Sequence, residues 1–301
     1  MVLVFIALFA ILSVSVPNFF STRNLQGLLL SVSLIGGISV TMMLVLALGE
    51  VDLSVASIVA FTGVVASLSI SAAHSVAVGV LAGVLAGAAV GLFNGVVVAK
   101  LHINSLIATL ATMEIVRGLA YIVSHGDAAI ISEESFFRLG AGSLFGIGIP
   151  IWENLLLFLL FGWLLNYTVF GKNVLAIGGN REAARLAGIA VSRIKIIVFV
   201  MQGIVAGLAG VLLAARMSLG DPKTSQGLEL GVISACVLGG VSLAGGIASI
   251  SGVLVGVLIM GSVQNAMSLL NVPTFYQYLI RGAILLAAVL FDQLRQRRRA
   301  V

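Results

Sequence analysis

Three ionisable side chains lie inside long apolar stretches of the chain, where a charge is costly and a functional site is the first hypothesis. Glu114 and Arg117 fall within residues 103–123, three positions apart, so on a helix they share one face and can pair with each other. Arg281 falls within residues 274–291. These charges are interpreted either as a clamp between helices or as the wall of a solute pathway.

Four amide side chains also lie in apolar stretches and could bond the hydroxyl groups of a passing solute. Each amide both donates and accepts hydrogen bonds, which suits a hydroxyl-rich molecule. Amide bonding between neighbouring helices is an equally good interpretation. With the charges above, the amides make up the candidate pathway residues: Asn94, Glu114, Arg117, Gln202, Gln264, Asn265 and Arg281.

Two glycine-containing segments interrupt apolar stretches and are candidate gates or helix breaks. In residues 49–54, Asp52 or Ser54 could cap the helix that follows. Residues 239–246 could form a broken helix or a tight turn. Turns without a gating role are an equally good interpretation. The candidate gate residues are Gly49, Asp52, Ser54, Gly239, Gly240, Ser242, Gly245 and Gly246.

Catalytic and metal chemistry find no support in the sequence. The three histidines are scattered, and Cys236 is the only cysteine, so an internal disulfide is excluded. No cluster has the spacing of a metal site or a catalytic triad. We therefore expect no catalytic residue, no bound metal and no enzyme activity in this chain.

The elements that position these residues must lie in a lipid bilayer. The chain has 301 residues, of which 60% are hydrophobic and 9% charged, and its mean hydropathy is +1.21. These values exclude a soluble enzyme, a disordered chain and a nucleic-acid-binding protein. Continuous apolar runs favour helices over a closed barrel. We predict an all-α bundle of about ten spans, over residues 1–16, 28–48, 53–71, 75–99, 103–123, 149–168, 194–216, 230–243, 246–266 and 274–291.

The placement of Lys and Arg predicts the orientation of this single domain, residues 1–301. With ten spans both termini lie on one side, and that side holds ten of these residues against four opposite. We therefore expect it to be cytoplasmic. It would carry the long loop 169–193 and the basic tail 292–301, and the long loop 124–148 would lie outside.

Glycine stripes predict close helix packing and a two-half architecture. Gly83 and Gly87 are followed, 169 residues later, by Gly252 and Gly256 in the same local sequence. Small residues at this spacing let helices approach closely in lipid. Because the matched segments would run in opposite directions, they are consistent with an inverted repeat, although chance matches are common in so biased a composition.

The cytoplasmic loop holds the sharpest motif. Its sequence, over residues 178–189, predicts a glycine turn, a capping Asn, a short Ala-rich helix and a terminating Gly. Such a charged helix could dock in a partner's groove or could be a solvated connector. The candidate docking residues are Gly179, Asn180, Glu182, Ala183, Ala184 and Gly188.

The motif Glu182-Ala183-Ala184-x3-Gly188 resembles the E-A-A-x3-G motif of ABC importer permeases. The segment Gly49-Glu50-Val51-Asp52-Leu53-Ser54 and residues 107–121 and 235–243 are similar to the ribose and L-arabinose group of sugar permeases. The resemblance covers nearly the whole chain. One departure is that the family motif continues to an Ile-x-Leu-Pro, whereas the matching positions from Val198 contain no proline.

This resemblance implies one membrane subunit of an ATP-driven sugar importer in a bacterial inner membrane, with L-arabinose as the expected cargo. Its implied partners are an ABC ATPase subunit, a periplasmic sugar-binding protein and a second copy of the chain. The sequence has no G-x4-G-K-[ST] motif. ATP and Mg²⁺ would therefore be bound by the ATPase, and this chain would carry no cofactor.

Three other functions are consistent with the residues. The cargo could be ribose, galactose or a signalling furanose. The chain could instead be a secondary transporter driven by a proton or sodium gradient, with Glu114 as its coupling carboxylate. A non-transporting membrane scaffold is disfavoured by the docking motif.

Overall fold

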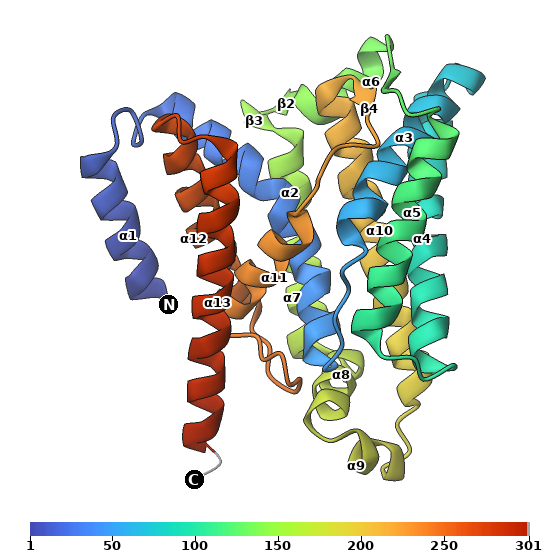
Figure 1. Ribbon diagram of the computed structural model, residues 1–301, viewed down its shortest axis with the longest axis vertical. Coiled ribbons are helices and arrows are strands. Elements are labelled where there is room, and N and C mark those ends of the chain that lie inside the picture. The colour runs from blue at the N-terminus through green and yellow to red at the C-terminus, as the bar shows by residue number, and fades with distance from the viewer. Residues whose placement is uncertain (300–301) are drawn as a thin grey trace.

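The computed structural model describes residues 1–299, and each predicted apolar segment forms a helix in it. Figure 1 shows these helices standing side by side in one bundle. The bundle helices are α1 (Val2–Ser15), α2 (Thr22–Ala47), α3 (Val55–Ala73), α4 (Val76–Ala99), α5 (Ser105–Val123), α7 (Ile149–Tyr167), α10 (Val191–Met217), α11 (Leu228–Leu238), α12 (Ile250–Leu269) and α13 (Thr274–Arg299).

Short elements close the two ends of the bundle. Helices α8 (Val169–Gly179) and α9 (Arg181–Leu186) lie at the lower end in Figure 1, which we call the α9 end. The opposite end carries α6 (Glu134–Ala141) and is called the α6 end. There β1 (Ala129–Ile130) pairs antiparallel with β4 (Leu219–Gly220), and β2 (Ser143–Leu144) pairs with β3 (Ile147–Gly148).

The structure confirms a polytopic helical bundle. Within residues 1–299, seven helices are long and apolar enough to cross a membrane, namely α2, α3, α4, α5, α7, α10 and α12, and the apolar parts of the predicted spans 1–16, 230–243 and 274–291 are shorter. The predicted span 230–243 is instead the 11-residue helix α11. At 1.5 Å per residue it is roughly 17 Å long, about half of a bilayer core. Residues 221–227, which form turns, precede it and descend from the α6 end (Figure 1).

The C-terminal helix reaches the α9 end of the bundle, and α1 points its N-terminus the same way (Figure 1). Helix α13 continues to Arg299. The arginine side chains of the predicted basic tail, 292–301, fall outside what the structure describes.

The order and directions of α2–α5 and α10–α13 are consistent with the predicted inverted repeat. The offset of 169 residues between Gly83 and Gly252 also carries Thr22, which begins α2, onto Val191, which begins α10 (22 + 169 = 191). The same offset carries Ser105, which begins α5, onto Thr274, which begins α13. In Figure 1 α2 descends while α10 ascends, and α5 ascends while α13 descends. The two halves therefore have opposite directions, as an inverted repeat requires.

Glycine contacts hold the central helices together. A Cβ on Gly87 of α4 would overlap the carbonyl oxygen of Gly203 on α10, and a Cβ on Gly203 would overlap that of Gly87. In the second half, a Cβ on Gly256 of α12 would overlap the Ala235 oxygen of α11. These backbones touch because the glycines carry no side chain, which confirms the predicted close packing.

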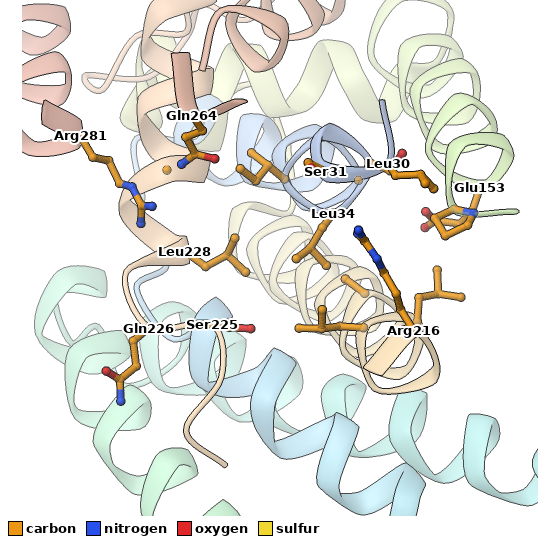
Figure 2. Close-up of a pocket in the computed structure, with 18 residues that line it drawn as sticks. Leu30, Ser31, Leu34, Glu153, Arg216, Ser225, Gln226, Leu228, Gln264 and Arg281 are labelled. Carbon is orange, nitrogen blue, oxygen red and sulfur yellow. The ribbon is translucent and has the colours of Figure 1, made fainter. Parts of the chain in front are cut away.

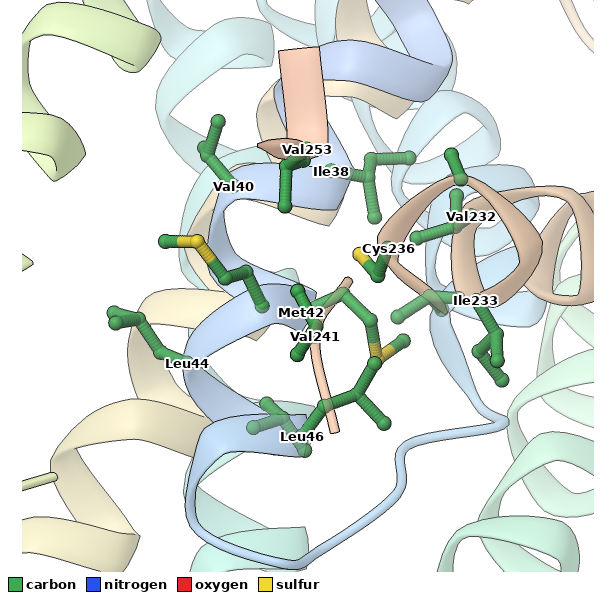
Figure 3. Close-up of a cluster of buried hydrophobic side chains, with 14 of the residues drawn as sticks. Ile38, Val40, Met42, Leu44, Leu46, Val232, Ile233, Cys236, Val241 and Val253 are labelled. Carbon is green, nitrogen blue, oxygen red and sulfur yellow. The ribbon is translucent and has the colours of Figure 1, made fainter. Parts of the chain in front are cut away.

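Helix α2 runs through the centre of the main apolar core. Its residues from Ile38 to Leu48 are buried, and Figure 3 shows Ile38, Met42 and Leu46 facing the α11 side chains around Cys236. Cys236 is itself completely buried, as expected of a small core residue. Because α2 and the α11 region are packed so tightly, movement at one end of α2 acts on its neighbours.

Candidate functional site

Helix α9 has the capped structure that its sequence predicts. The Asn180 side chain accepts a hydrogen bond from the Ala183 amide at 2.9 Å, which begins the helix. Gly188 adopts a φ of +82°, a left-handed conformation that ends it. Glu182 and Arg185 form an ion pair at 2.7 Å with both side chains mostly exposed. The helix therefore presents charged groups to solvent at the end of the bundle.

The segments predicted separately as docking motif and gates meet at one point, which we call the glycine junction: Ala47, Gly49, Gly178, Gly245 and Gly246. The Gly246 amide donates to the Ala47 carbonyl at 2.9 Å. A Cβ on Gly178 would overlap that same carbonyl oxygen, and one on Gly245 would lie 2.8 Å from the Gly178 oxygen. The ends of α2 and α8 and the loop after α11 are therefore in backbone contact.

The remaining residues of the second gate segment lie beside the junction. Gly239 packs against Gly252 at the start of α12, and Gly240 has a φ of +86°. The Ser242 hydroxyl accepts a hydrogen bond from the Ala244 amide at 3.2 Å. Residues 239–246 therefore form a tight turn between α11 and α12, which is one of the two conformations predicted.

Glu50 connects three elements beside the glycine junction. Its Oε1 accepts a hydrogen bond from Arg181 of α9 at 2.6 Å and another from the Lys195 ammonium group of α10. Glu50 itself follows α2 by three residues. A polar cavity of about 510 Å³ opens next to this ion triad and is also lined by His102 and Ser105. One carboxylate therefore joins the end of α2 to both α9 and α10.

The extended residues 51–53 are held by α5. The Val51 amide donates to the Ser105 hydroxyl at 3.1 Å, and the Leu53 amide donates to the Thr109 hydroxyl at 3.1 Å. Non-helical backbone inside a membrane protein is stable only when such partners satisfy its polar groups. Two hydroxyls on α5 provide those partners here.

Asp52, Ser54 and Asn94 form a buried chain of hydrogen bonds at the start of α3. Asp52 Oδ1 accepts from the Ser54 amide at 2.9 Å and from its hydroxyl at 2.6 Å. The Asn94 amide nitrogen donates to the Ser54 hydroxyl at 2.9 Å. Ser54 occupies the N-cap position of α3, but its side chain makes no capping bond. Asp52 therefore orders this turn, and Asn94 ties it to α4.

The two intramembrane arginines both hold the turn residues before α11, residues 221–227. Arg117 of α5 donates to the carbonyl oxygens of Pro222 at 2.5 Å and Thr224 at 2.9 Å. Arg281 of α13 donates to the Gly227 carbonyl at 3.2 Å. The predicted pairing of Arg117 with Glu114 is wrong: the structure shows no ion pair between them, because the guanidinium group turns to these carbonyls.

A cavity of about 320 Å³ lies in the half of the bundle nearer the α6 end. Figure 2 shows Gln264 and Arg281 on one side of it and Glu153 and Arg216 on the other. Gln226 also lines it. Carboxylate, guanidinium and amide groups around one cavity can bond hydroxyl groups from several directions.

The four amides predicted for the pathway have different surroundings. Gln264 lines the cavity. Asn265 exchanges two hydrogen bonds of 2.9 Å with Asn24 of α2, which is helix-to-helix bonding. Asn94 holds the α3 turn described above. Gln202 is completely buried, and no described residue bonds either atom of its amide.

Sequence reasoning missed several charged residues of these sites. Lys195 and Arg216 lie in α10 and Glu153 lies in α7, and none of them is among the candidate site residues named from the sequence. Glu50 was read only as part of a quoted segment. Their positions in the sequence could have indicated them, because each of these charged residues borders an apolar run. A buried ionisable group in such a place points to a function.

The fold and the site define a class of protein: a multi-span membrane permease built as an inverted repeat, with a small capped helix on its connector. The chain belongs to the family described as branched-chain amino acid transport system / permease component, whose model matches residues 24–289. It is 73% identical to the L-arabinose ABC transporter permease protein AraH of Azospirillum brasilense over 99% of this chain and 88% of that protein.

More distant relatives complete the comparison. The chain is 54% identical to the L-arabinose transport system permease protein AraH of Escherichia coli K12, over 99% of this chain and 90% of that protein. It is 38% identical to the ribose import permease protein RbsC of the same strain, over 97% of this chain and 92% of that protein. No solved structure matches the chain. The predicted resemblance to ribose and L-arabinose permeases is confirmed.

Proposed function

We propose that this chain is the permease subunit of an ABC importer that carries L-arabinose into the cytoplasm. The observation behind the choice of sugar is the order of similarity: 73% and 54% identity to two L-arabinose permeases, against 38% to a ribose permease, each over nearly the whole chain. Ribose, galactose and a signalling furanose remain the alternative cargoes.

Helix α9 is the proposed docking site for the ATPase subunit. Its ion pair is exposed at the end of the bundle, and the residues before it, at the end of α8, contact the end of α2 and the loop after α11. A short rigid helix that is supported from behind can transmit a push from a partner. ATP and Mg²⁺ would then act in the ATPase, and this chain would perform no chemistry of its own.

The proposed orientation places the α9 end in the cytoplasm and the α6 end outside. The end of α13 and helix α9 lie at the same end (Figure 1), and the sequence gives that side most of the loop Lys and Arg residues. A periplasmic sugar-binding protein would deliver the sugar at the α6 end, near the cavity lined by Gln264 and Arg281.

A second copy of the chain is proposed to complete the pathway. Glu114 lies in the middle of α5, is exposed on the bundle surface, and has no ion-pair partner among the described residues. A carboxylate facing lipid at that depth is costly, so its face of α5 requires water or protein. Two copies that face each other across α5 would give both Glu114 side chains an aqueous pathway.

Reconstitution tests this proposal. The purified chain is combined with its ATPase and sugar-binding protein in liposomes, and uptake of labelled L-arabinose, ribose and galactose is measured. We expect vanadate-sensitive L-arabinose uptake that requires both partners. Uptake by the chain alone, or uptake abolished by an uncoupler in ATP-loaded vesicles, would show a secondary transporter instead. Preference for another sugar would correct the cargo.

A further inference from the structure

The two partners of Glu50 in the ion triad differ in how they are held. The Lys195 side chain is 5% exposed and is fixed inside the bundle on α10, whereas the Arg181 side chain is 56% exposed and sits on the first residue of α9. The Glu50 side chain is 8% exposed. Buried charges need a partner, and Lys195 supplies one that does not depend on α9. Arg181 is therefore the contact that can change when α9 moves.

Glu50 is followed at once by the extended residues that α5 holds. The backbone from Glu50 to Leu53 covers four residues, and within them the Val51 and Leu53 amides donate to the Ser105 and Thr109 hydroxyls. Extended backbone without a helix of its own can shift as a unit when one end is pulled. A displacement of the Glu50 carboxylate therefore acts on α5 through these two bonds.

We propose that Glu50 is a positioning residue through which α9 moves residues 50–53 and α5 during transport. Arg181 is the moving contact and Lys195 the fixed one. This inference rests on the proposed function, in which α9 receives the push of the ATPase. It adds that the movement enters the bundle through one carboxylate, in parallel with the backbone contacts of the glycine junction.

The test uses the assembled complex in liposomes and measures two rates, ATP hydrolysis and sugar uptake. Arg181→Gln and Glu50→Gln are compared with Arg193→Gln. Arg193 lies at the same end of the bundle, is exposed, and forms no ion pair among the described residues, so its substitution controls for the loss of one cytoplasmic charge.

We expect Arg181→Gln to lower the sugar transported per ATP hydrolysed by about tenfold, within the usual range of coupling between two sites. Co-purification with the ATPase and the ATP hydrolysis rate should stay near the wild-type values. Glu50→Gln should give the same ratio, and the double variant should be no worse than either single variant, because both changes remove one link. Arg181→Lys should recover part of the ratio, since it retains the charge.

Each outcome decides the inference. A normal ratio in Arg181→Gln overturns it, and so does an equal loss in Arg193→Gln. A variant that loses ATPase binding shows that Arg181 acts in docking and not in transmission, which also overturns it. If Glu50→Gln fails to fold, Arg181→Gln still decides, because Lys195 continues to neutralise Glu50. Failure of the wild-type complex to transport sugar would instead contradict the proposed function.

Discussion

Thr109 and Arg117 lie eight residues apart on α5, and each holds a different non-helical segment. Thr109 accepts a hydrogen bond from the Leu53 amide in the segment between α2 and α3, and Arg117 donates to the carbonyls of Pro222 and Thr224 in the segment before α11. These segments occupy corresponding places in the two inverted halves. Helix α5 therefore holds both non-helical segments in place, one toward each end of the bundle.

Arg117→Gln should release the turn residues before α11. Two hydrogen bonds from a charged group to backbone carbonyls are lost, and the carbonyls at membrane depth have no other partner of that strength. We expect uptake to fall by at least about tenfold, because each hydrogen bond to a charged group contributes about 1.5–3 kcal/mol of stabilisation. Uptake per mole of purified complex is the measurement.

Arg138→Gln is the matched control for Arg117. Its guanidinium forms an ion pair with Glu134 in which both side chains are more than 70% exposed, and such surface pairs contribute little. Its uptake should equal that of the wild type. Normal uptake in Arg117→Gln would show that the turn residues are held by other contacts.

Gly87→Ala should loosen the contact between α4 and α10. Its Cβ would overlap the Gly203 carbonyl oxygen, and overpacking of this kind costs about 1–3 kcal/mol. The midpoint of thermal unfolding in detergent is the measurement. Gly118→Ala on α5 is the control, because no heavy atom lies within 4 Å of its Cβ position, and it should be neutral or slightly stabilising. Equal midpoints would argue against the close contact.

Gly245→Val should block the glycine junction. Gly245 has a φ of +89°, and a Cβ there would lie 2.8 Å from the Gly178 oxygen and 2.9 Å from the Gly49 nitrogen. We expect uptake to be lost while the amount of protein in the membrane stays unchanged. Gly126→Val separates backbone strain from crowding, because its φ is +83° but the space around it is open. Uptake unchanged in Gly245→Val would remove the junction from the mechanism.

The charge of Glu182 should matter for docking. Glu182→Arg breaks the exposed pair with Arg185 and reverses the charge that α9 presents to its partner. We expect ATP hydrolysis to become uncoupled from sugar uptake, with normal insertion in the membrane. Hydrolysis by the complex and uptake into vesicles are measured side by side. A variant that transports normally would contradict docking through α9.

The amide pair of Asn24 and Asn265 separates a structural from a cargo role. Asn265→Ala leaves Asn24 without its partner. We expect the free energy of unfolding to fall by about 0.6 kcal/mol, which is usual for hydrogen bonds between membrane helices. The apparent KM for sugar should not change, and the double variant Asn24→Ala, Asn265→Ala should be no less stable than the single variant. A raised KM with normal stability would place Asn265 in the pathway.

The sequence by itself determined the helices and the motif on the connector. Lipid leaves only hydrogen-bonded helices or closed barrels, so hydropathy alone located the segments that became α2, α5 and α12. Capping is a local interaction, and for that reason Asn180 and Gly188 correctly marked both ends of α9. The 169-residue offset between glycine motifs likewise recorded the inverted halves.

Only the tertiary structure decided which polar residues meet. Glu50 and Lys195 are 145 positions apart, and Asn24 and Asn265 are 241 apart. Such pairs depend on how distant helices pack, which spacing along one helix does not reveal. Local spacing even suggested the wrong partner for Arg117, because the carbonyls that its guanidinium group contacts, those of Pro222 and Thr224, are more than 100 residues away in the sequence. The composition of the chain therefore determines where its helices lie. The packing of distant helices determines which polar side chains form contacts.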